Sequence, residues 1–204
     1  MTGVPPQIAL ATHNPHKLRE LARICAEWPT SWVSVETHDP AAFPDVEETG
    51  DTYLENARLK AVAVAAALAL PALADDSGIE VDALGGKPGP RSARYAGEHA
   101  SDEENLRALI QAVRGVPAAG RTARYRCVAA LAWPDGRFAH VEGVCEGTLR
   151  TTPAGSNGFG YDPIFEPVGR EVTMAELADA EKDRISHRGR AFRALHQALD
   201  PTRT

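Results

Sequence analysis

The chain has 204 residues, of which 22 are basic and 28 are acidic, and its formal net charge is −6. This length allows one large domain or two closely joined lobes, and it is enough to bury about 70% of the surface that the unfolded chain exposes. Nucleic acids and anionic membranes need a basic face on their partner, so the acidic balance argues against both, although a local basic pocket stays open. We expect neither nucleic acid nor a membrane as a partner.

The cysteines and the apolar runs indicate a compartment. Cys25, Cys127 and Cys145 form no CxxC pair and leave one thiol over in any disulfide scheme, which is typical of a reducing environment. The first residues lack the charged head and apolar run of a secretory signal. The longest apolar run, 61–74, is shorter than the roughly 20 residues that a membrane span needs. The sequence predicts a soluble, cytoplasmic protein whose cysteines fill the core.

The N-terminal part reads as a strand, a polar loop and a helix. Residues 8–11 form a short apolar run, and a helical pattern of apolar residues follows the loop 12–17. Backbone N–H groups at a helix N-terminus attract anions, and Lys17 adds a positive charge there, so the loop could hold a phosphate. Thr12 and Asn14 could instead serve only as helix caps, and both interpretations stay open.

The next segments predict a strand over 32–37 and a long helix. Residues 52–55 have the capping-box pattern, so the helix begins there and runs to about Leu70. Asn56 and Lys60 are four residues apart and therefore share one face of this helix. They could point toward a site, but a solvated face is the favoured interpretation.

Two adjacent carboxylates, Asp75 and Asp76, stand at the centre of the chain. Apolar segments 71–74 and 79–84 flank them, which predicts a tight Asp-Asp-Ser-Gly corner where a strand ends. Neighbouring carboxylates repel each other unless a cation, a proton or backbone donors compensate, so the corner could hold a divalent metal. An ordinary turn is the alternative, because Asp, Ser and Gly are favoured in turns for local reasons.

The second half of the chain reads as a helix, a hairpin and further short helices. Capping-box patterns at 101–104 and 173–176 predict two helix starts, and the runs 121–133 and 137–149 predict an antiparallel hairpin. A final helix then places Phe192, Leu195 and Leu199 on its inner face.

Two later segments carry candidate binding groups. The glycine-rich loop 155–165 holds aromatic rings that could stack on a planar base or plug the core. Lys182, His187 and Arg188 lie near the start of the final helix and offer donors suited to phosphate or to carbonyl oxygens.

Taken together, five blocks in this order resemble the inosine/xanthosine triphosphate pyrophosphatase family, and they cover nearly the whole chain. The blocks are 11–17 with Glu20, 48–57 with Lys60, 74–97, 158–165, and Lys182 with 185–188. The resemblance implies an α/β fold with a long central mixed β-sheet flanked by helices. It also implies a single catalytic domain over residues 1–204, built of two lobes with the active site in the cleft between them, and assembly as a homodimer.

The resemblance further implies a reaction and its site. A deaminated purine nucleoside triphosphate (ITP, dITP or XTP) and water give the nucleoside monophosphate and pyrophosphate, with Mg²⁺, which removes these nucleotides from the pool. Asp76 is the implied catalytic residue, and it is also the implied metal ligand together with the Glu47-Glu48 pair, of which Glu48 is favoured. The implied substrate contacts are Thr12, His13, Asn14, Pro15, His16, Lys17, Ser77 and Lys182 for the triphosphate, and Phe159, Gly160, Tyr161, Asp162, His187 and Arg188 for the base.

Three alternatives stay open. The same phosphate chemistry could act on other modified bases, such as methylated pyrimidines. An aspartyl-phosphate phosphatase is a second class of enzyme, although its Asp-x-Asp spacing is absent here. A nucleotide-binding module without turnover is the third, and it does not require a metal and water arrangement.

Overall fold

The computed structural model of the chain describes residues 3–200. The chain divides into two compact units. Unit 1 is formed by the residues up to Asp76, by 127–143 and by the residues from Arg188 on, and unit 2 is formed by 77–126 and 144–187. The expectation of a single catalytic domain with two lobes stays a prediction.

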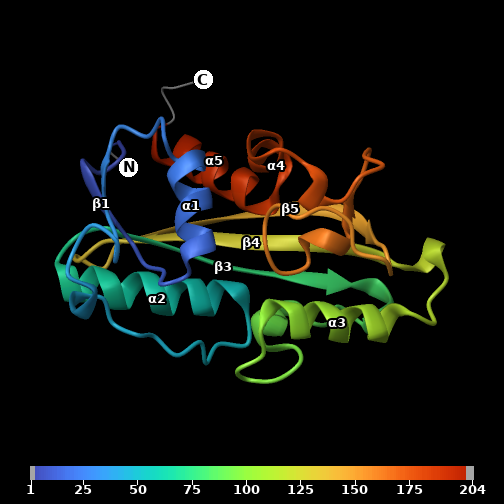
Figure 1. Cartoon of the computed structure of the whole chain (residues 1–204). Helices are drawn as coiled ribbons and strands as arrows, with labels where there is room; N and C mark the ends of the chain where they lie inside the picture. Colours follow the sequence, from blue (N-terminus) through green and yellow to red (C-terminus); the bar gives the residue numbers. More distant parts are fainter. Residues whose placement is uncertain (1–2, 201–204) are drawn as a thin grey trace. The chain divides into compact units, whose positions relative to one another are not determined.

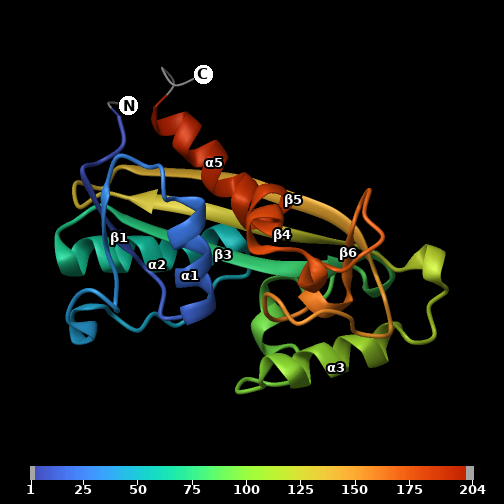
Figure 2. The ribbon, with the colours of Figure 1, turned by 45° about the horizontal axis from the view of Figure 1, so that its top comes forward.

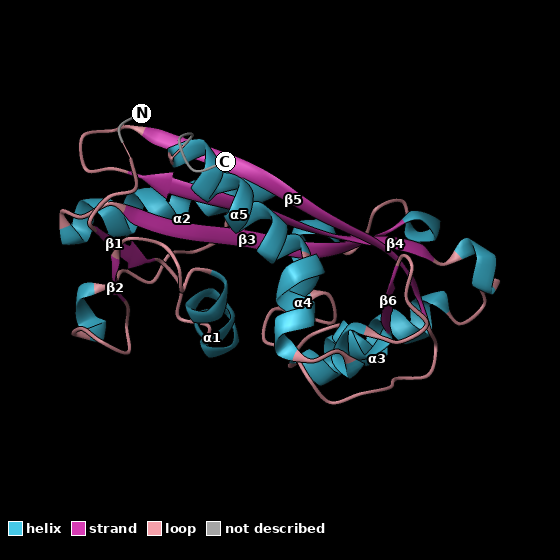
Figure 3. Ribbon diagram, turned by 90° about the horizontal axis from the view of Figure 1, so that it is seen from above, coloured by secondary structure: helices cyan, strands magenta, loops and turns pink. Residues whose placement is uncertain are grey.

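The strands form one mixed sheet of six strands in the order β2-β1-β3-β4-β5-β6. Strand β1 pairs with β2 and with β3 in parallel, whereas β5 pairs with β6 antiparallel. Figure 3 shows β4 and β5 as long neighbouring strands. The strands are β1 (Gln7–Leu10), β2 (Ser31–Val33), β3 (Ala72–Val81), β4 (Thr122–Ala132), β5 (Phe138–Leu149) and β6 (Phe165–Pro167). The predicted mixed sheet flanked by helices is confirmed.

In unit 1, helices cover both faces of the strands. Helices α1 (Pro15–Ile24) and α5 (His187–Leu199) lie on one face, and α2 (Tyr53–Leu68) lies on the other (Figure 1). Successive side chains of a strand point to opposite faces. Leu73 of β3 accordingly packs in the cluster that holds the inner side of α1 and α5, whereas Ala72 and Ala74 pack against the small residues of α2.

Unit 2 has a core of its own. Helix α3 (Asp102–Val113) contributes Leu109 and Val113, and the outer parts of the long strands contribute Ile79, Tyr125 and Leu149. Helix α4 (Asp179–Ile185) and strand β6, which is labelled in Figure 2, belong to the same unit. None of the helices within residues 3–200 combines the length and the apolar character that a membrane crossing requires.

The local helix signals are confirmed. Thr52, Ser101 and Thr173 each form the predicted capping box, the last of them at a 3₁₀ turn, Met174–Glu176.

The strand predicted over 32–37 is shorter in the structure, since β2 ends at Val33. The predicted hairpin, over 121–133 and 137–149, corresponds to β4 and β5. These two strands are neighbours in the sheet. The three cysteines are free and buried, as predicted.

The prediction of a corner at Asp75 and Asp76 is wrong. Strand β3 continues without a break from Ala72 to Val81, so the two carboxylates lie in the middle of a strand. Turn preference is a local property, and the place of β3 in the sheet overrides it: β3 pairs with β1 at Ala72 and Leu73 and neighbours the long strand β4 on its other side. Adjacent residues of a strand point to opposite faces, so the carboxylates of Asp75 and Asp76 meet different partners.

Candidate active site

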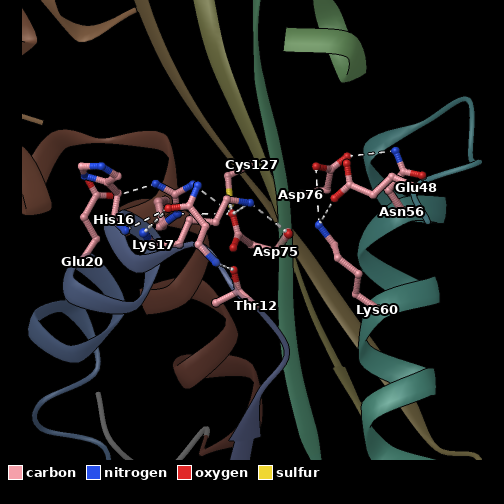
Figure 4. A network of polar contacts seen from close by, with 12 residues as sticks. Thr12, His16, Lys17, Glu20, Glu48, Asn56, Lys60, Asp75, Asp76 and Cys127 are labelled. Carbon is pink, nitrogen blue, oxygen red and sulfur yellow. Dashed lines mark hydrogen bonds and ion pairs between the residues drawn. The ribbon is translucent and has the colours of Figure 1, made fainter. Parts of the chain in front are cut away.

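Asp75 and Asp76 point away from each other, each toward its own set of polar partners. Figure 4 shows Asp75 facing Lys17 and Asp76 facing Asn56 and Lys60. Both carboxylates are buried. The repulsion that adjacent acidic residues would suffer is thus relieved by separation across the strand and by compensating groups on each face.

On the face of α1 and α5, Asp75 is held by two cations. Its Oδ2 atom lies 3.1 Å from Lys17 Nζ and 3.0 Å from Arg188 Nη2. Burial by itself would raise the pKa of the Asp75 carboxyl, but the charges of Lys17 and Arg188 outweigh burial and hold that pKa below its usual value. The guanidinium of Arg188 also binds the buried Glu20. These four side chains form an alternating chain of acidic and basic groups.

Lys17 is placed by the first turn of α1. The side chain of Asn14 caps this helix by accepting hydrogen bonds from the backbone N–H groups of His16 (2.8 Å) and Lys17 (3.3 Å). Thr12 Oγ1 in turn accepts a hydrogen bond from the Asn14 N–H at 3.2 Å. The capping interpretation is therefore confirmed for Asn14. It leaves the phosphate interpretation open, because the positive end of the helix and Lys17 both remain at this loop.

On the face of α2, Asp76 meets an amide and an ammonium group. Asn56 Nδ2 donates to Asp76 Oδ2 at 3.2 Å, and Lys60 Nζ lies 3.7 Å from Asp76 Oδ1. Burial raises the pKa of Asp76, and the charge of Lys60 opposes this rise only in part. The prediction of a solvated face for Asn56 is wrong, since its side chain is fully buried.

The residues fit a magnesium ion that shares its ligands with a substrate. The ammonium of Lys60 bonds Glu48 Oε1 and also lies near Asp76, so both carboxylates converge on a single positive charge. Within residues 3–200 no group of three or more His, Cys, Asp or Glu side chains is arranged to hold a metal. Mg²⁺ is usually bound through one or two carboxylates and the phosphates of the substrate, so two carboxylates suffice. Glu47 is exposed and Glu48 is half-buried.

In unit 2, Asp162 organises the glycine-rich loop. Its Oδ2 atom accepts hydrogen bonds from Lys182 Nζ at 2.6 Å and from the Phe159 N–H at 2.9 Å, and its Oδ1 atom accepts one from Tyr125 OH at 3.3 Å. Lys182 Nζ also lies 5.3 Å from the centre of the Phe159 ring. The His187 ring stacks on Tyr125 with 4.5 Å between centroids.

A glycine is required beside this buried pair. Gly158 has a φ of +76°, and a Cβ atom there would lie 2.1 Å from Asp162 Oδ2 and 2.7 Å from Lys182 Nζ. Any other residue would therefore displace the Asp162–Lys182 ion pair or the loop.

The two aromatic residues of the loop differ in burial. Tyr161 is buried in the core of unit 2, and its hydroxyl donates to Ser92 O at 2.7 Å. Phe159 is half-buried. The hydrophobic-plug interpretation therefore holds for Tyr161, whereas Phe159 keeps a ring surface that a base could use. Gly160 is fixed by its N–H, which donates to Asp102 Oδ2 at 3.1 Å.

The predicted site residues fall into two groups. Unit 1 contains the loop 12–17, Glu48, Asp76 and Arg188, and unit 2 contains the rest: Ser77, Phe159, Gly160, Tyr161, Asp162, Lys182 and His187. Within unit 1, His13 is exposed, Pro15 is the first residue of α1, and His16 is half-buried and contacts Arg19. Ser77 is half-buried in β3.

Some residues of the site were not among the predicted ones. Asn56 and Lys60 were signalled by their helical spacing and by the family block 48–57 with Lys60, but neither signal predicted their contacts with Asp76. Tyr125 lies in a strand pattern with no signal of its own. Arg188 was expected in the base pocket, and the structure joins it to Glu20 and Asp75 in unit 1. Its contact with a base stays a prediction.

Known proteins similar to this chain identify its family. The model of the Ham1 family matches residues 8–198. A dITP/XTP pyrophosphatase of Streptomyces avermitilis is 50% identical over 189 residues, which are 93% of this chain and 94% of the relative. One of Geobacillus kaustophilus is 47% identical over 94% of this chain and 93% of the relative.

Solved structures similar to this chain include members of the same family. The Ham1 protein of Staphylococcus aureus superposes with a TM-score of 0.83 at 38% identity, covering 97% of this chain and 100% of that one. A nucleoside-triphosphatase and dITP/XTP pyrophosphatase of Mycobacterium abscessus has a TM-score of 0.73 at 42% identity, covering 93% of this chain and 98% of that one. Because the family model and these relatives match nearly the whole chain, the chain belongs to the Ham1 family.

Proposed function

We propose that this chain hydrolyses deaminated purine nucleoside triphosphates, namely ITP, dITP and XTP, to the monophosphate and pyrophosphate. The chain is a nucleoside triphosphate pyrophosphatase. The observation that carries the proposal is that Glu48 and Asp76 converge on the ammonium group of Lys60. On the other face of β3, Lys17 lies beside a helix N-terminus and contacts Asp75. The dITP/XTP pyrophosphatases at 47 to 50% identity give the substrate class.

The phosphate chemistry assigns roles to the residues of unit 1. Attack of water at the α phosphorus builds negative charge on phosphate oxygens and on the departing pyrophosphate. The N–H groups at the start of α1 and the Lys17 ammonium would neutralise part of that charge. Glu48 and Asp76 would hold Mg²⁺, which when bound neutralises phosphate charge and lowers the pKa of a coordinated water.

Asp76 is suited to accept a proton. Burial raises the pKa of its carboxyl, and a positioned carboxylate can take a proton from the attacking water. Asn56 donates to Oδ2, so the carboxylate is oriented and its Oδ1 atom is directed toward Lys60. We assign Asp76 the role of orienting and deprotonating the attacking water.

The base would be read by the groups of unit 2. Hypoxanthine and xanthine carry an oxygen at position 6 where adenine has an amino group, so donors such as His187 or backbone N–H groups would favour them. The ring of Phe159 offers a stacking surface. Guanine shares the oxygen, so its rejection must depend on the 2-amino group, which costs about 1–3 kcal/mol when it is left without an acceptor.

The proposal includes the assembly and the compartment. We propose a cytoplasmic homodimer without nucleic-acid partners. The three free, buried cysteines support a reducing compartment, and the net charge of −6 supports the lack of nucleic-acid binding.

Product analysis tests the reaction. The purified protein is incubated with ITP, XTP, GTP, ATP and a methylated pyrimidine triphosphate, with and without Mg²⁺. We expect monophosphate and pyrophosphate from ITP and XTP, only with metal, and little product from ATP.

Other products would change the assignment. Diphosphate and phosphate would place the cut at the γ phosphate and refute the mechanism. Preferred cleavage of the pyrimidine triphosphate would move the substrate class, and measurable binding without any product would favour a nucleotide-binding module.

A further inference from the structure

Asn56 joins two parts of the site through one amide group. Its Oδ1 atom accepts a hydrogen bond from the Gly50 N–H at 2.8 Å, and its Nδ2 atom donates to Asp76 Oδ2 at 3.2 Å. The side chain is fully buried, so water does not compete for either bond. In Figure 4 the Asn56 side chain projects from α2 toward Asp76, next to Glu48.

Gly50 is the second half of this connection. A Cβ atom at Gly50 would lie 2.7 Å from Asn56 Oδ1 and 2.6 Å from Glu55 Cβ, so the loop approaches α2 as closely as its backbone allows. The loop is also held after Gly50, because Glu55 Oε2 accepts hydrogen bonds from the N–H groups of Asp51 (2.8 Å) and Thr52 (3.0 Å). Glu48 lies two residues before Gly50 in this same loop.

We propose that Asn56 is a positioning residue that sets the spacing between the carboxylates of Glu48 and Asp76. One end of its amide holds the loop that carries Glu48, and the other end holds Asp76 itself. Lys60 contacts the same two carboxylates but acts as a charge, whereas Asn56 orients them without adding one. The inference rests on the proposed function only in taking these two carboxylates as the magnesium ligands.

The chain supplies a matched control for this role. Asn105 of α3 is also a buried asparagine whose amide bridges a loop: it accepts a hydrogen bond from the Ala96 N–H at 2.8 Å and donates to Ala93 O at 2.9 Å. Its partners are backbone groups and not a carboxylate. Asn56→Ala and Asn105→Ala therefore remove the same chemical group from similar surroundings.

The test is a calorimetric titration of Mg²⁺ into protein saturated with a non-hydrolysable α,β-methylene analogue of ITP. We expect Asn56→Ala to weaken magnesium binding by about 10- to 100-fold, the range typical of residues that orient metal ligands. We expect Asn105→Ala to lower the Tm and to leave magnesium binding unchanged. A folded Asn56→Ala protein with the magnesium affinity of the wild type would overturn the proposal.

Gly50→Ala provides a second, independent test. It removes neither Asn56 nor any carboxylate, but its Cβ atom would push against Asn56 Oδ1 and disturb the other end of the bridge. We therefore expect it to weaken magnesium binding in the same direction. If Asn56→Ala does not fold, Gly50→Ala decides, and wild-type binding by that variant would refute the bridge.

Different experimental outcomes would refute the proposed function and this inference. Wild-type protein that forms products but binds no Mg²⁺ in the titration would overturn the inference and leave the reaction standing. Wild-type protein that binds Mg²⁺ through an Asn56-dependent site, but releases no pyrophosphate from any triphosphate, would refute the reaction alone.

Discussion

Asp75 and Asp76 show how two identical side chains acquire opposite properties within one residue of each other. On one face of β3 the charges of Lys17 and Arg188 overcome burial and lower the pKa of Asp75, and on the other face burial dominates and raises the pKa of Asp76. A group held firmly as an anion is suited to structure, because it keeps its cations in place. A group with a raised pKa is suited to proton transfer.

We expect Asp76→Asn to lower kcat by about 10²- to 10⁴-fold, since an amide cannot accept the proton of the attacking water. Folding should be largely intact, because the amide has almost the same shape as the carboxylate and can still accept a hydrogen bond from Asn56 Nδ2. Steady-state kinetics with ITP and a thermal melt check both parts. An unchanged rate would remove Asp76 from the chemistry.

The sequence predicted elements well where their signals are local. Capping boxes at Thr52, Ser101 and Thr173 were predicted from residues three positions apart, and the structure contains all of them. Strand β3 was not predictable in the same way, because its Asp-Asp-Ser-Gly run favours a turn by itself and becomes a strand only as part of the sheet, next to β4. The contacts of α2 with Asp76 likewise depend on how the helix is rotated.

In the glycine-rich loop, we expect Phe159 to contribute mainly to nucleotide binding and Tyr161 mainly to the stability of the fold. We expect Phe159→Ala to weaken binding of ITP by about 1–3 kcal/mol, the range of one stacked base, because this ring is only half-buried. Tyr161→Ala is the matched comparison, and it should mainly lower the Tm, because Tyr161 is buried and bonded to Ser92 O. Calorimetry with a non-hydrolysable ITP analogue and thermal melts measure both quantities. Collapse of the Tm in Phe159→Ala would make that ring part of the core instead.

At the scale of the whole molecule, the site combines segments that are remote in the chain. Arg188 reaches Asp75 across 113 positions, and Glu20 reaches Arg188 across 168. Spacing patterns cover a few turns of a helix or strand, so they could not pair these residues. The resemblance to a family supplied the site residues in this sequence, but it placed Arg188 with the base and gave no indication of its ion pairs with Glu20 and Asp75.

This buried ion-pair chain makes the stability of the protein depend on pH in a defined direction. The pKa of Asp75 is lowered in the folded state relative to about 3.9 in the unfolded chain, so below that value the unfolded state binds a proton that the folded state does not. The stabilisation from Asp75 is therefore complete above about pH 4 and is lost progressively as the pH falls further.

Asp75→Asn isolates this contribution. At pH 7 we expect the variant to be less stable by about 3–5 kcal/mol, because Arg188 and Lys17 lose a buried partner. The difference in the free energy of unfolding between wild type and variant should shrink as the pH is lowered from 4 toward 3, in urea titrations with EDTA present so that no metal contributes. A difference that stays constant over this range would mean that Asp75 keeps its ordinary pKa in the folded protein, and that the two cations do not hold it as an anion.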